Sequence, residues 1–158
     1  MSKHFAAFTA LFSIGLVCAL FTANAVACGD SLYRVGKGVS YRVYTAPLPG
    51  SVLVYGQSES AQQLAEALAL SGHGVRVVEN ESDLNQELQS GNYDVVIAAY
   101  SDHTAVESSA GSTAFLPVAM DEHEAEVAKA AYGKVLVADK DELKHYLKAI
   151  HKSLKSKT

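Results

Sequence analysis

The chain has 158 residues, 49% hydrophobic and 19% charged, which is enough apolar sequence to bury the core of one ordinary domain. Beyond residue 27 it carries 12 Lys and Arg residues against 17 Asp and Glu residues, a net charge of −5. This acidic balance argues against a nucleic-acid partner, since binding of a phosphate backbone needs clustered Lys and Arg. The basic residues near the end, Lys152, Lys155 and Lys157, are typical of a helix C-terminus, where the helix dipole favours cations.

Residues 1–27 are typical of a secretory signal peptide. Lys3 precedes an uncharged apolar run from 5 to 21, and two overlapping small-x-small patterns then end at Ala25 and Ala27. A run of this length is also compatible with a membrane-spanning anchor, but the small residues at its end favour cleavage. We therefore expect an exported protein of the bacterial periplasm or cell envelope.

Cys28 directly follows this cleavage pattern and is the only cysteine beyond it, so no disulfide can form within the mature chain. Its position resembles the lipobox of bacterial lipoproteins, in which the first mature residue is a cysteine that receives lipid. Ala25 departs from that motif, because leucine is usual there. The alternatives are a free thiol and an intermolecular disulfide. Lipid on Cys28 is the only membrane attachment we expect after cleavage.

Residues 28–50, punctuated by glycine and proline, are expected to form an arm or linker. From Ser51 onward, short apolar runs typical of buried strands alternate with segments of helical periodicity. The strand runs are 52–55, 75–78, 95–99, 115–119 and 135–138. Only 15 residues, 100–114, separate the third run from the fourth, so the helix between them must be short or missing.

Polar residues mark the expected helix starts. Ser58 or Ser60 precedes the first helical segment, and Asn80 or Ser82 precedes the second. Asp121 with Glu124 three residues later resembles a capping box. Together with the strand runs, these signals predict an α/β fold over residues 51–158. It is a single doubly wound domain with a five-stranded parallel sheet of order 2-1-3-4-5, the flavodoxin-like arrangement.

The fourth strand run contains Pro117. A proline cannot donate a backbone hydrogen bond to a neighbouring strand, so it favours an edge position or a strand end. We expect one of these two placements for Pro117.

Three features carry a family resemblance: the opening strand 52–55, the segment Tyr93-Asp94-Val95-Val96-Ile97, and the closing pattern of 135–137 followed by Asp141-Glu142-Leu143. In these features and their spacing, residues 51–152 resemble the receiver domain of bacterial response regulators. The resemblance implies a fold in which an aspartate at the end of the third strand accepts a phosphoryl group.

The resemblance does not extend to the residues of the phosphorylation switch. It places Ala99 at the phosphoacceptor position and Gly56 and Gln57 where the family has an acidic pair that holds Mg²⁺. The family's hydroxyl residue falls near Ala119, and Lys140 lies about two positions beyond the family's lysine. Phosphoryl transfer needs a carboxylate nucleophile and oxygen ligands for the cation. We therefore expect no catalytic residue and no cofactor.

Asp102, His103 and His123 follow the third and fourth strands, at the carboxyl ends where such sheets bind ligands. Histidine with carboxylate is a ligand set for Zn²⁺ or Cu²⁺, but a solvated loop and an acidic helix start explain the same residues. The segment Gly29-Asp30-Ser31-Leu32 matches the GDSL esterase motif, without the preceding strand or a late Asp-x-x-His. We expect neither a metal site nor an esterase.

Taken together, the sequence predicts a non-catalytic, receiver-like domain of the cell envelope that acts through an unidentified protein partner. By analogy with receivers, we expect the partner at the face built from the fourth strand, the helix over 121–133 and the last helix. The alternative is a periplasmic metal- or small-ligand-binding protein that uses the carboxyl ends of the strands.

Overall fold

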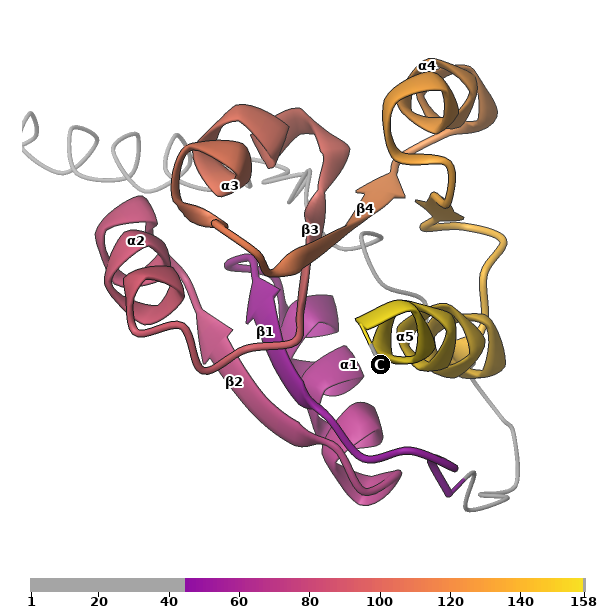
Figure 1. Cartoon of the computed structure of the whole chain (residues 1–158). Helices are drawn as coiled ribbons and strands as arrows, with labels where there is room; N and C mark the ends of the chain where they lie inside the picture. The colour runs from indigo at the N-terminus through magenta and orange to yellow at the C-terminus, as the bar shows by residue number, and fades with distance from the viewer. Residues whose placement is uncertain (1–44, 158) are drawn as a thin grey trace, which may run out of the picture.

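The computed structural model describes residues 45–157, which form an α/β domain around a five-stranded, all-parallel sheet (Figure 1). A 3-10 turn, η1 (Tyr100–Asp102), precedes the third of five α-helices. The elements in chain order are β1 (Ser51–Tyr55), α1 (Glu59–Leu70), β2 (Gly74–Val78), α2 (Glu81–Gln89), β3 (Val95–Ala99), α3 (His103–Ser109), β4 (Ala114–Ala119), α4 (Glu122–Tyr132), β5 (Leu136–Val137) and α5 (Leu143–Lys157).

The strand order β2-β1-β3-β4-β5 confirms the predicted flavodoxin-like arrangement, and α3, at seven residues, is the short third helix. The predictions for the signal peptide, for Cys28 and for most of the arm concern residues outside the described range. Within residues 45–157, no helix has the length and apolar character needed to cross a membrane.

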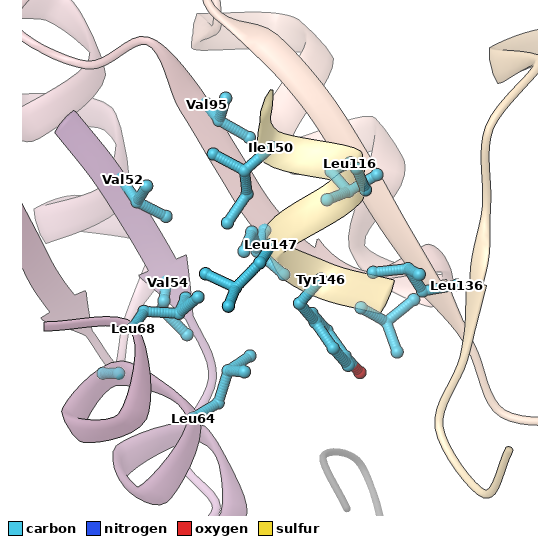
Figure 2. Close-up of a cluster of buried hydrophobic side chains, with 14 of the residues drawn as sticks. Val52, Val54, Leu64, Leu68, Val95, Leu116, Leu136, Tyr146, Leu147 and Ile150 are labelled. Atoms are coloured by element: carbon cyan, nitrogen blue, oxygen red, sulfur yellow. The ribbon is translucent and has the colours of Figure 1, made fainter. Parts of the chain in front are cut away.

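Helices cover both faces of the sheet. Alternate residues of each strand point to opposite faces, so apolar side chains of one strand contribute to two separate cores. Val52 and Val54 of β1 pack with α1 and α5, whereas Leu53 packs with α2 and α3. The cluster that contains Val52 and Val54 is the larger core of the domain. In it, side chains of α5 point toward valines of the strands and toward leucines of α1 (Figure 2). Figure 1 shows α1 and α5 on the same side of the sheet.

Side-chain caps fix the starts of three helices. The Ser58 hydroxyl accepts a hydrogen bond from the Ala61 N–H at 3.2 Å, and the side-chain oxygen of Asn80 accepts one from the Asp83 N–H at 2.9 Å. Asp121 accepts one from the Glu124 N–H at 2.8 Å. Each such cap stabilises its helix by about 1 kcal/mol. The structure therefore selects Ser58 and Asn80 from the two pairs of predicted caps.

Pro117 lies neither at the end of β4 nor on the outermost strand of the sheet, but β4 is locally the edge at this residue. It pairs in register with Ala98 of β3, and β4 lies between β3 and β5. However, β5 pairs only with Val118 and Ala119. Because β4 has no β5 partner at Pro117, the missing N–H breaks no bond between these two strands. The sheet is in this sense only four strands wide at the proline.

The last residues of the predicted arm are bound to the turn between α1 and β2. The Ala46 N–H donates to the Ser71 carbonyl at 2.7 Å, and the Gly74 N–H donates to the Gly50 carbonyl at 3.0 Å. The Gly50 N–H donates to Nδ1 of His73 at 3.2 Å. His73 is buried, and this burial lowers the pKa of its imidazole. Nδ1 can accept this bond only while it carries no proton.

Stability is expected to fall as the pH is lowered from 7.5 to 5.5, in part because of His73. Its pKa in the folded state lies below the unfolded value of about 6.5, so the unfolded chain binds the proton first. Urea unfolding of the wild type and of His73→Asn, whose side-chain oxygen can replace Nδ1 as acceptor, measures this contribution. The variant should lose less stability over this range; an unchanged pH dependence would contradict the assignment.

Candidate functional site

The carboxyl ends of the strands form the edge at which sheets of this kind bind ligands. β3 ends at Ala99, whose side chain is 5% exposed, and β4 ends at Ala119, which is fully buried. Two methyl groups therefore lie where the receiver resemblance places a phosphoacceptor carboxylate and a hydroxyl. Neither can act as a nucleophile or bind a cation.

Gly56 and Gln57, which follow β1, hold the end of β2. The Gly56 N–H donates to the Val78 carbonyl at 3.0 Å, and the Gln57 side-chain amide donates to the Glu79 carbonyl at 2.8 Å. The Gln57 amide carries no charge, and glycine offers no side-chain ligand. These two residues thus fasten a loop and provide no acidic pair.

Lys140 is exposed beyond β5, where its ammonium group forms an ion pair with Glu122 in the first turn of α4. A hydrogen bond and the charge of Lys140 lower the pKa of the Glu122 carboxyl. Pairs of this kind contribute little to stability when both side chains are in solvent. Lys140 therefore connects the loop after β5 to α4.

Asp102 lies in η1 and is half-buried. Burial raises the pKa of its carboxyl, and a hydrogen bond from Ser101 partly opposes this shift. Burial also raises the pKa of Tyr55, at the end of β1, with smaller contributions from the charges of Asp102 and Glu81. Asp102 is thus an acid within electrostatic reach of the β1 end.

The two histidines considered above as metal ligands have different surroundings. Nδ1 of His103 lies 2.8 Å from the Tyr100 carbonyl, and its ring stacks on Tyr100 with centroids 4.9 Å apart. His123 is exposed on the first turn of α4. In the part of the chain that the structure describes, no three His, Cys, Asp or Glu side chains are close enough to hold a metal ion. The structure therefore does not gather Asp102, His103 and His123 into one ligand set.

An aromatic group that the sequence did not indicate joins η1, β4 and α4. Tyr132 of α4 lies edge-on to Tyr100, with centroids 6.1 Å apart, and edge-on to Phe115, at 5.0 Å. The Tyr132 hydroxyl also donates a hydrogen bond to Glu107 of α3. Burial and this acceptor raise the pKa of Tyr132 to about 12. These contacts fix α4 against α3 and against the start of β4.

Asp141 and His145, an acid and a histidine near the end of the described chain, have a structural role at the start of α5. Asp141 lies 2.9 Å from Nδ1 of His145, and its other oxygen accepts a hydrogen bond from the Val137 N–H at 2.7 Å. These contacts connect β5 to α5. The serine of the esterase-like motif lies outside the described residues.

No protein-family model matches this chain, and no curated protein matches it in sequence.

Proposed function

We propose that the protein is a non-catalytic, receiver-like domain of the cell envelope that acts by binding a protein partner. The observation that carries this proposal is the buried methyl group of Ala99 at the end of β3. Gly56 and Gln57 support it, since they supply no carboxylate beside that position. A receiver-like fold with these residues does not transfer a phosphoryl group, so the function we propose for it depends on a surface that binds a partner.

The partner surface we propose has its centre on α4. The fourth strand, expected at the same face together with α5, does not contribute to it, because β4 lies inside the sheet and its residues 116–119 are buried. This helix packs on the sheet through the small residues Ala125 and Ala128, and on its outer side Val127 is 53% exposed. Met120, just before the helix, is also exposed. Val127 and Met120 lie on and next to the same helix, and exposed apolar side chains of one element support an interaction site there.

A ligand site at the strand ends is the alternative. It would use Asp102, His103 and His123, but the His103 ring is engaged with Tyr100 and His123 faces solvent. The arrangement of these side chains gives that alternative less support than the exposed apolar surface gives to a partner.

Photo-cross-linking in cells tests the proposed surface. A photoreactive amino acid replaces Val127 in the full-length chain, and a matched chain carries it at Leu70, which is 64% exposed on α1. We expect one discrete adduct from position 127 that is absent from position 70. Val127→Glu should weaken the association about tenfold or more, because it places a charge in an apolar contact.

The same adduct from both positions, or no adduct from position 127, would contradict a partner surface on α4. Circular dichroism of the purified variants serves as the folding control, since both positions are exposed.

A further inference from the structure

The outer side of α5 carries a single stripe of lysines, consisting of Lys144, Lys148, Lys152 and Lys155. At 100° per residue these four positions fall within about 80° of the helix circumference and extend for about 16 Å along it. The helix packs on the sheet through the opposite side, which contains Tyr146, Leu147, Ile150 and Leu154. The stripe therefore points directly away from the core.

The helix dipole does not account for this stripe. Its influence is confined to the last turn, whereas Lys148 and Lys152 lie further back in the helix. Lys144 is paired with Glu142 at 2.9 Å. Among the described residues, Lys148, Lys152 and Lys155 have no ion pair, so their charges are available to another molecule.

The remainder of the domain has the opposite charge. α5 contains five lysines and no acidic residue. The other described residues contain four Lys and Arg residues against 16 Asp and Glu residues, a net charge of −12. Glu59 and Glu66 of the neighbouring α1 belong to this acidic part. The domain is therefore strongly polarised, and a negatively charged surface would attract α5 and repel the rest.

The chain enters the domain beside the same helix. A Cβ atom added to Gly50 would lie 2.8 and 2.9 Å from the two methyl carbons of Leu154, so the backbone at Gly50 packs directly on α5. Ser51 and Lys157 both bind Asp94: the Ser51 N–H donates to its carboxylate at 2.9 Å, and the Lys157 ammonium donates to its carbonyl at 2.8 Å. The preceding segment, 28–44, is itself basic, with three Lys and Arg residues against one acid.

We propose that the lysine stripe of α5 lies on the surface of an anionic phospholipid membrane. The proposal rests on the export expected for this protein, on the positive charge of α5 against the acidic remainder of the domain, and on the entry of the chain beside the C-terminal end of this helix. Because the apolar side of α5 is buried in the core, the contact is electrostatic and does not involve insertion. This goes beyond the expectation that lipid on Cys28 is the only attachment.

Residue-resolved amine labelling tests the contact. The full-length chain, as the cell processes it, is reconstituted with vesicles of phosphatidylcholine alone or of phosphatidylcholine with phosphatidylglycerol. A water-soluble amine reagent is applied, and mass spectrometry follows each lysine. We expect labelling of Lys148, Lys152 and Lys155 to slow several-fold only on the anionic vesicles, with Lys129 and Lys134 of the same molecule unchanged. High salt should abolish the difference, because it screens exposed charges.

A second measurement uses vesicle flotation in a Cys28→Ser chain, which cannot carry lipid on that residue. K148Q/K152Q/K155Q is compared with K129Q/K134Q/K140Q, which changes the net charge equally. The first triple variant should lose roughly 100-fold in partitioning to anionic vesicles, at about fivefold per lysine near the surface, and the second should lose far less.

Equal protection of stripe and control lysines, or equal partitioning of the two triple variants, would overturn the proposal. Loss of an acidic protein partner from the stripe variant, with vesicle binding intact, would overturn it as well. Cross-linking from position 127 reports on α4, which carries none of these lysines, so failure here is distinguishable from failure of the partner surface on α4.

Discussion

Replacing Ile150 with alanine is expected to lower the free energy of unfolding by about 3 kcal/mol, because the change removes buried carbons and leaves a cavity. Ile150 is fully buried in the core between the sheet, α1 and α5 (Figure 2). Urea unfolding followed by circular dichroism measures the loss as a lower midpoint with an unchanged slope. For a domain of this size the melting temperature should fall by more than 10 °C, at about 4 °C or more per kcal/mol.

Lys148→Ala, two residues earlier on the same helix, is the matched control. Its side chain is exposed, so its effect should stay within about 0.5 kcal/mol. Equal losses for the two variants would mean that α5 does not pack on the sheet through the side that carries Ile150.

Introducing an aspartate at Ala99 is expected to destabilise the domain by about 2 to 4 kcal/mol at pH 7, since it buries a carboxylate without a partner. It should also fail to restore a phosphorylation switch. Gly56 and Gln57 offer no acidic ligands for Mg²⁺. Incubation with acetyl phosphate and Mg²⁺ should therefore label neither the wild type nor Ala99→Asp, as read by intact mass.

Ala99→Asn separates charge from size, because asparagine has the shape of aspartate without the charge. The difference between the two variants should shrink as the pH is lowered and the new carboxyl takes up a proton. An aspartyl phosphate on the wild-type chain would contradict the proposed non-catalytic function. Phosphorylation of Ala99→Asp alone would show that Mg²⁺ is held without the expected acidic pair.

The strand order could be predicted because the relevant signals are local. Continuous apolar runs such as 95–99 mark strands that are buried on both faces, and the helices between them require parallel crossovers. The cap at Asp121 could be predicted as well, since it bonds to an N–H three residues ahead, whereas for the second helix the sequence left Asn80 and Ser82 as alternatives. The same reasoning found Ala99, because β3 ends where its apolar run ends.

Contacts between elements could not be predicted in this way. Tyr132 meets Tyr100 and Phe115 only because the register and crossing of α4, β4 and η1 bring them together. The place of Pro117 within the sheet could not be predicted for a related reason. Its placement depends on the length of β5, and a strand that pairs at two residues leaves little trace in the sequence.

The dependence of the larger core on α5 also affects when the chain can fold. This helix ends at residue 157, and it packs on Val52 and Val54 of β1, the first strand of the domain. A nascent chain therefore cannot close that core until α5 has left the ribosome, because domains fold as units. Under the export that the sequence predicts, such a delay would leave this core open during synthesis, and an unfolded chain is the form that a narrow translocation channel can accept.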